Sequence, residues 1–283
     1  MRQAETNRFI GRSFMKKIIS TLVCAMLAFS LVGCADSEKE EAISKFKENV
    51  STIEANNDSV QKALDSLNEV IDSGDEPLDE STLSTAKQVA QDAKAKIVEV
   101  PEQPSKKEDI ISKNTELEKE LDVSDTLTQL GDAQKNLSDS IAQMKQVTNP
   151  SEGFVVERLK TVPSVTEVLA ATEDNDPNEQ LHKDGGYTSA VYFSSDQVDA
   201  AANFLEGDSI AKGTDGGGCI EVYETADNAN KRNDYLAAFD GSVFASGSHK
   251  VIGTVVIRTS NKLTATQQTD LETNIYNALT SLN

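Results

Sequence analysis

One seam of residues runs from position 43 to position 71 at alternating intervals of three and four, and Asn57 is its single polar member. This is the heptad spacing of helices that pack on other helices. It predicts a helix over about residues 37–72, which would be about 54 Å long at 1.5 Å per residue. A stripe this narrow has to be buried on a neighbouring helix.

Weaker versions of the same pattern return in three later stretches, over residues 83–97, 110–121 and 127–144. These four segments predict a helical hairpin or bundle that forms a stalk, and the second carries alanines that permit close approach. The stripes could be buried within one chain or against a partner helix. Self-association of the stalk is therefore possible, with Asn57 setting the register.

A change in composition near Asn149 and Pro150 divides the chain. Residues 35–149 contain one aromatic residue and two glycines, whereas residues 150–283 contain ten aromatic residues and eleven glycines. Proline also disfavours helical geometry in the residue before it. We therefore expect a helical region over 34–149 and a second domain over 150–283.

The second region alternates between patterns of strands and patterns of helices. Strands are expected at 165–172, 187–193, 220–223 and 251–259, the last of these central in the sheet because it is apolar on both faces. For residues 165–172, a continuation of the preceding helix is the alternative. Helices are expected at 155–159, at 196–205, from a cap at Asp227 to residue 239, and after a cap at Thr264. The chain as a whole is predicted to be α+β, with a small C-terminal α/β domain built on a mixed sheet.

The beginning of the chain has the features of a processing signal. Two lysines at 16 and 17 precede an apolar run over residues 18–32, which is shorter than the roughly 20 residues needed to span a bilayer. We expect translation to begin at Met15. The run ends in a motif that resembles the bacterial lipobox and consists of Leu31, Val32, Gly33 and Cys34.

The resemblance to a lipobox implies cleavage after residue 33 and a diacylglycerol on the Cys34 thiol. The alternative is an ordinary secretory signal whose cysteine is incidental. We expect the mature chain to be anchored by lipid at the outer face of the cytoplasmic membrane, or cell surface, with residues 35–41 as a hydrophilic tether. Two acyl chains meet the requirement for stable anchoring.

The charge of the mature chain limits its partners. Residues 1–33 hold five basic residues and one acidic residue, so their removal changes the formal net charge from −20 to −24. Such a chain is repelled by phosphate backbones, which argues against nucleic-acid binding. With Cys24 removed and Cys34 lipidated, Cys219 has no partner for an internal disulfide.

Two longer stretches resemble known families. Residues 67–121 are similar to FIVAR-type helical modules of Gram-positive surface proteins, through DESTLSTAKQVAQDAKAKIVEV and SKKEDIISKNTELEKEL. The region after residue 150 resembles an uncharacterised C-terminal domain of Gram-positive lipoproteins, through residues 173–178, 185–188, 213–223 and 230–236. The second resemblance implies a compartment and a domain boundary, and it implies no chemistry.

Three groups of residues are candidates for ligand binding. Thr214 and Asp215 precede glycines whose N–H groups could face an anion, although a structural turn is the competing interpretation. Asp174, Asp176 and Asn178 alternate as oxygen ligands do in calcium loops, but the glycine and glutamate of an EF-hand are missing, so an acidic turn competes with a divalent-cation site. Arg232 could hold an acidic ligand, or form a surface ion pair.

No catalytic residues are predicted, and no cofactor is expected apart from that possible cation. Cys219 with His249 or His182 could form a thiol and base, but a cysteine at the start of a strand is typical of a buried, inert thiol. We therefore expect an outward-facing lipoprotein whose stalk carries a module that binds an extracellular or envelope partner. The alternative is an envelope-acting hydrolase or thiol enzyme that uses the C-terminal domain.

Overall fold

A computed structural model describes residues 34–242 and 245–282, with side chains from Ser37 onward. The signal peptide and its motif Leu31, Val32 and Gly33 lie outside the described residues. The described chain forms two compact units, one of residues 34–51 and 101–119 and the other of residues 52–100 and 120–282. The predicted α+β class is confirmed, because helices are followed by a five-stranded sheet with helices packed on it.

The four predicted stalk helices are all present. They are α2 (Cys34–Ile71), α3 (Glu80–Lys94), α4 (Lys107–Leu117) with the short 3-10 turn η1 (Glu118–Glu120), and α5 (Ser124–Gln146). Residues 35–41, expected as a tether, are the first turns of α2. No helix within the described ranges is long and apolar enough to cross a membrane.

In the first unit, the beginning of α2 packs on α4. Glu38 pairs with Lys107, and Lys45 pairs with Glu118 at 3.6 Å, so the residue numbers rise together and the two helices run parallel. Asn114 is buried between them and donates from Nδ2 to the carbonyl oxygen of Ala42 at 2.9 Å. Asn114, a polar residue of the predicted stretch 110–121, therefore finds a hydrogen-bond partner inside the unit.

In the second unit, the end of α2 packs on α3 and α5 around a core that includes Leu67, Ala86 and Leu137. The buried residues of α3 all have small side chains, which lets the helices approach closely; they are Ala86, Ala90 and Ala93. Asn57 donates to the carbonyl oxygen of Val98 at 2.7 Å and accepts from its N–H at 3.0 Å. Asn57, the polar residue of the predicted seam, thus holds the segment after α3 against α2.

The change of composition at residue 149 marks a change of secondary structure inside one compact unit. The Gln146 side chain at the end of α5 donates to the carbonyl oxygens of Leu279 and Ser281, at 2.9 and 2.8 Å. The N–H of Thr254 donates to the carbonyl oxygen of Val147 at 3.1 Å. These contacts join the last stalk helix directly to the α/β part.

The α/β part contains α6 (Glu152–Leu159), β1 (Val165–Ala170), β2 (Tyr187–Ser195), α7 (Ser209–Lys212), the 3-10 turn η2 (Gly213–Gly216), β3 (Gly217–Tyr223), α8 (Ala226–Ala237), β4 (His249–Ile252), β5 (Val255–Thr259) and α9 (Ala265–Thr280). The strand order is β1-β2-β3-β5-β4. Every neighbouring pair is antiparallel, so the predicted mixed sheet is wrong.

The error arises from the segment between β2 and β3. A helix expected at 196–205 would have allowed a parallel crossover, but those residues form turns around Asp199, and the helical residues before β3 are those of the short α7 and η2. Parallel neighbours need a connection that carries the chain back along the sheet, whereas residues 196–216 return it so that β3 pairs antiparallel with β2. The prediction of a single strand at 251–259 is also wrong, because β4 and β5 form a hairpin there. Gly253 in its turn has a φ of +57°, and Ile252 pairs with Val255.

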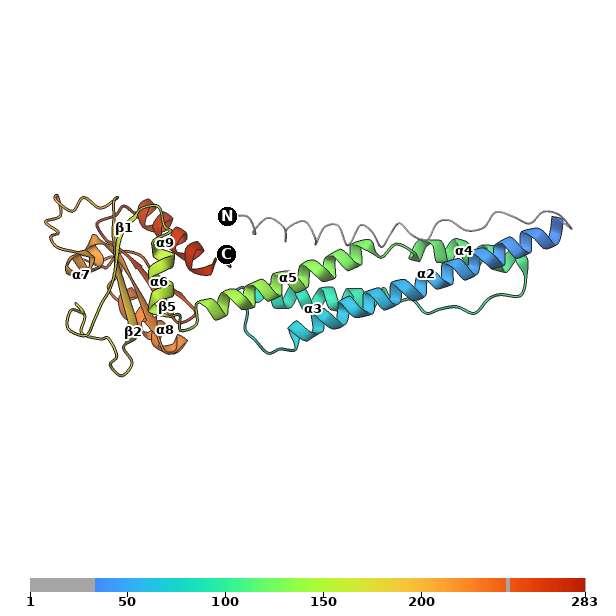
Figure 1. Ribbon diagram of the computed structural model, residues 1–283, viewed down its shortest axis with the longest axis horizontal. Helices are drawn as coiled ribbons and strands as arrows, with labels where there is room; N and C mark the ends of the chain where they lie inside the picture. Colours follow the sequence, from blue (N-terminus) through green and yellow to red (C-terminus); the bar gives the residue numbers. More distant parts are fainter. Residues whose placement is uncertain (1–33, 243–244, 283) are drawn as a thin grey trace, which may run out of the picture. The chain divides into compact units, whose positions relative to one another are not determined.

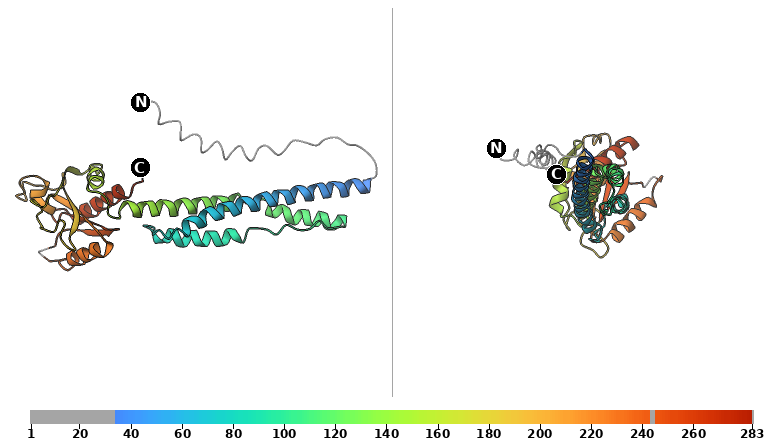
Figure 2. Two further views of the ribbon diagram at one scale, coloured as in Figure 1. Left: turned by 60° about the horizontal axis from the view of Figure 1, so that its bottom comes forward. Right: turned by 90° about the vertical axis from the view of Figure 1, so that its right-hand side faces the viewer.

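The sheet is covered by helices on both faces (Figure 1). Side chains alternate along each strand, so Phe193, Ile220 and Ile257 pack with α6 and α9 on one face. Tyr192 and Cys219 face α8 and the loop 171–186 on the other face. Figure 2 shows these layers from two further directions.

One of the two helix caps predicted in this part, Thr264, is confirmed. Thr264 caps α9 in a capping box with Gln267, as its sequence predicts. The cap of α8 is Thr225 rather than Asp227, and Asp227 lies in the first turn, where a negative charge is also favourable. In α9, Leu271 and Ile275 are buried, whereas Leu282 lies beyond the helix and is exposed.

Candidate functional site

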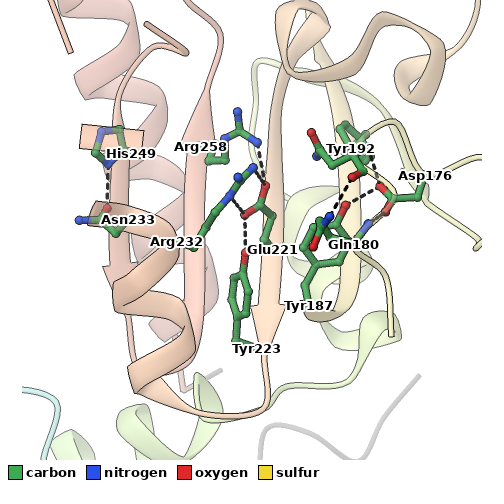
Figure 3. A network of polar contacts seen from close by, with 11 residues as sticks. Asp176, Gln180, Tyr187, Tyr192, Glu221, Tyr223, Arg232, Asn233, His249 and Arg258 are labelled. Atoms are coloured by element: carbon green, nitrogen blue, oxygen red, sulfur yellow. Dashed lines mark hydrogen bonds and ion pairs between the residues drawn. The ribbon is translucent and has the colours of Figure 1, made fainter. Parts of the chain in front are cut away.

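The α8-facing side of the sheet holds a buried ionic cluster centred on Glu221 (Figure 3). The Arg232 side chain donates to Glu221 through Nε at 2.8 Å and through Nη2 at 2.9 Å. Arg258 donates through Nη1 at 2.7 Å, and the Tyr223 hydroxyl donates at 2.9 Å. Each carboxylate oxygen of Glu221 therefore accepts two hydrogen bonds, which satisfies a group that has no exposure to water.

The four residues of this cluster come from two neighbouring strands and one helix. Glu221 and Tyr223 are two residues apart on β3, so both side chains point to the α8 face. Arg258 on β5 is the cross-strand partner of Cys219, which places it diagonally opposite Glu221. Arg232 enters from the second turn of α8. The surface ion pair expected for Arg232 is thus a largely buried one.

Protonation in the cluster is fixed by these contacts. Burial raises the pKa of the Glu221 carboxyl, but the charges and hydrogen bonds of Arg258 and Arg232 outweigh it, and the pKa lies below its ordinary value. Burial lowers the pKa of the Arg232 guanidinium, but Glu221 raises it above the ordinary value. One carboxylate thus faces two guanidinium groups, which leaves one surplus positive charge.

A pocket of about 420 Å³ opens beside this cluster, between α8, the end of β3 and the loop before β2. Arg232 and Lys231 contribute charge, Tyr223 and Tyr235 contribute aromatic surface, and the rest of the lining is amide side chains and glycines, namely Asn178, Gln180, Asn228, Gly185 and Gly186. Such a mixture of fixed polar groups and aromatic walls is typical of a site for a small polar ligand.

The loop before β2 is held in place by Asp176. Its carboxylate accepts the N–H groups of Gln180 at 2.7 Å and Leu181 at 3.0 Å, and the hydroxyl of Tyr187. Burial raises the pKa of the Asp176 carboxyl, but these hydrogen bonds outweigh it, so the pKa is below its ordinary value. Asn178, at the pocket wall, donates to the Tyr192 hydroxyl at 3.0 Å.

The structure therefore favours the acidic-turn interpretation of Asp174, Asp176 and Asn178. Both oxygens of Asp176 accept hydrogen bonds from the loop itself, and the Asn178 amide is turned to Tyr192. Asp174 lies in a neighbouring acidic pocket with Glu173. Within the described residues, no group of three or more His, Cys, Asp or Glu side chains is arranged to hold a metal ion.

Thr214 and Asp215 lie at the opposite end of β3 from the α8 pocket, so the structure does not bring them together with Arg232. The carbonyl oxygen of Asp215 accepts the Ser260 hydroxyl at 2.7 Å. At Gly218, an added Cβ would lie 2.2 Å from the Arg258 carbonyl oxygen and 2.4 Å from the Phe193 ring. The glycines thus allow close strand approach, as the structural-turn interpretation predicts.

Cys219 is a buried thiol at 0% exposure. Burial raises its pKa well above the ordinary value, which disfavours the thiolate. Cys219, Arg258 and His249 occupy one row across β3, β5 and β4, so the cysteine and histidine are separated by two strand spacings, about 9–10 Å. His249 instead contacts Asn233 at 2.7 Å, and His182 contacts Glu173 at 2.9 Å.

Sequence reasoning identified Arg232 and Asn178 but missed Glu221, Arg258, Tyr223, Asn228 and Tyr235. A signal for the first two was present. Glu221 stands between Ile220 and Val222, and Arg258 follows Ile257, so each is a lone charge in an apolar strand. Opposite lone charges in buried strands indicate a pair, because an unpaired buried charge is very costly.

Comparison of the chain with protein-family models, curated proteins and solved structures gave no match. The resemblance to FIVAR-type modules and to Gram-positive surface lipoproteins stays a prediction from the sequence.

Proposed function

We propose that the protein is a membrane-anchored, extracytoplasmic lipoprotein whose α/β part binds a partner or ligand of the cell envelope or its surroundings. The anchor is proposed from the sequence, in which two lysines, an apolar run and the motif ending at Cys34 follow one another. The observation that supports binding is the pocket beside α8, where Arg232 is held by Glu221. Fixed polar groups lower the entropic cost of holding a ligand.

A binding role fits the described chemistry better than a thiol mechanism does. A nucleophilic thiol has to reach the substrate and lie within hydrogen-bond reach of a base. Cys219 is buried, and His249 lies two strands away from it with Asn233 as its partner. The pocket, in contrast, is open and is lined by groups suited to recognition.

The proposed anchor would place an ordered helix next to the membrane. One diacylglycerol on Cys34 supplies two acyl chains, which is enough for stable membrane attachment. Because α2 begins at Cys34, the chain would leave the lipid as a helix. Its acidic charge would keep it away from anionic headgroups, so contact with the membrane would be limited to the lipid.

Fractionation of a bacterial host that processes lipoproteins tests the anchor. The wild-type protein should be found with membranes and should incorporate labelled palmitate, whereas Cys34→Ser should lose the label and the membrane association. Cys24→Ser is the matched control, because Cys24 lies within the apolar run and should not be needed for lipidation. A Cys34→Ser protein that keeps its label would refute the proposed lipidation site.

A further inference from the structure

We propose that the α8 pocket binds a carboxylate on a small hydroxylated molecule, such as a sugar acid, with Arg232 as the group that receives the carboxylate. This names the ligand class of the binding role proposed above and rests on that role. The pocket itself is formed by described residues of one compact unit.

The Arg232 guanidinium is fixed from two sides. Two of its three nitrogens donate to Glu221, and its Cζ lies 5.5 Å from the centre of the Tyr235 ring. Within the described part of the chain, Nη1 donates no hydrogen bond to protein, and the side chain keeps 17% of its exposure. A planar guanidinium held in this way presents its free N–H groups to a carboxylate with little further loss of side-chain entropy.

The charge of the cluster matches one carboxylate. Glu221 carries one negative charge and faces both Arg232 and Arg258, which leaves one positive charge without a counterion inside the cluster. Arg258 is only 7% exposed, so water compensates little of this surplus. A monoanionic ligand at the Arg232 edge would neutralise it, whereas a phosphate dianion would reverse it.

The lining of the pocket differs from the rest of this acidic chain. None of its nine lining residues is acidic, although the whole chain has a net charge of −20. The neighbouring pocket, by comparison, is lined by Glu173, Asp174 and two further carboxylates. Asp227 pairs with Lys231 at 2.6 Å, so the positive charge that this pocket offers to a ligand is that of Arg232.

The neutral part of the lining suits hydroxyl groups. Tyr235 is 57% exposed and offers ring surface for the apolar face of a sugar ring. The amide of Asn228 makes no side-chain hydrogen bond within the described residues and can both donate and accept. The side-chain Nε2 of Gln180 donates to the carbonyl oxygen of Asn178 at 3.3 Å. The side-chain oxygen of Gln180 can then accept a hydrogen bond from a ligand hydroxyl.

Isothermal titration calorimetry on the full chain that carries Cys34→Ser tests the ligand class. The probes are glucuronate, its neutral relative glucose, and inorganic phosphate, all at a pH above the second pKa of phosphate, where phosphate is a dianion. Glucuronate should bind, and glucose and phosphate should bind at least about tenfold more weakly, since each lacks either the carboxylate or the single charge. Equal affinity for glucose, tighter binding of phosphate, or no binding of glucuronate would overturn the proposal.

Two isosteric variants locate the site. Asn228→Asp adds a negative charge to the pocket lining, and it should weaken glucuronate binding at least about fivefold. The fold should be retained, because an acidic residue in the first turn of α8 is favourable. Asn230→Asp makes the same change two residues away, at an exposed position outside the lining, and should alter the affinity by less than about twofold.

Equal weakening by both variants, or by neither, would place the ligand elsewhere. Failure of this proposal is distinguishable from failure of the proposed function. The titration uses a chain that carries no lipid, so a negative result leaves membrane anchoring by Cys34 and binding of a different ligand open to their own tests.

Discussion

Replacement of Glu221 by glutamine is expected to destabilise the α/β part strongly. The amide keeps the shape of the side chain but removes its charge, so Arg232 and Arg258 would face each other without a counterion. One carboxylate oxygen would also become an NH₂ group that points at donors. Of the four hydrogen bonds to Glu221, two would be lost.

The magnitude follows from these losses. Hydrogen bonds to charged groups contribute about 1.5–3 kcal/mol each, so two lost bonds amount to about 3–6 kcal/mol. Removal of one partner from a buried ion pair costs about 3–5 kcal/mol. Both routes give a loss of about 4 kcal/mol in the free energy of unfolding, which is a large part of the total for a typical domain.

Urea unfolding monitored by tyrosine fluorescence is the suitable assay. The chain has five tyrosines and no tryptophan, and all five tyrosines follow residue 186, so the signal reports on the α/β part. Glu224→Gln is the matched control, because Glu224 is exposed just beyond the end of the same strand. A loss below about 1 kcal/mol for Glu221→Gln, at unchanged urea dependence, would refute the role assigned to the cluster.

Two further predictions concern the same face of the sheet. The pKa of Glu221 is lower in the folded chain than in the unfolded chain, so its contribution to stability is present above about pH 4.3 and is lost as the pH falls through the folded value. The stability difference between wild type and Glu221→Gln, measured by urea unfolding from pH 7 to pH 3, should therefore shrink only below about pH 5; a constant difference would contradict this. In the Cys34→Ser mature chain, Cys219 should react with N-ethylmaleimide only after unfolding in urea, as followed by mass spectrometry; rapid reaction of the native chain would contradict its burial.

The helices could be predicted from the sequence because their signal is local. The heptad seam specified α2 to within three residues at each end, since a period of three and four is compatible only with a helical face. The strands around Tyr187 and Ile220 were recognisable for a similar reason, as short runs of β-branched and aromatic residues.

The sheet topology depended on a segment whose sequence misleads. Residues 196–205 include alanines and a leucine that favour a helix, but Phe204 is 91% exposed and has a φ of +55°. A helix there would have had little apolar surface to bury, and the Asp199 side chain instead accepts the N–H of Ala202 in a turn. The strands on either side of this segment, β2 and β3, pair antiparallel.

The candidate site was only partly predictable because it is assembled by strand pairing. Arg232 and Asn178 could be selected as polar residues in suggestive segments. The contact between Glu221 and Arg258, however, depends on the register of β3 against β5, which no local pattern specifies. Thr214 and Asp215 attracted attention through their glycines, but those glycines serve strand packing at the other end of β3.

The intact mass of the protein extracted from membranes of a lipoprotein-processing host tests the lipoprotein proposal most directly. The expected mass is that of residues 34–283 plus a diacylglyceryl group on Cys34, with or without a further acyl chain on the new amino terminus. A mature chain that begins at another residue, or that begins at Cys34 without lipid, would contradict membrane anchoring through this cysteine.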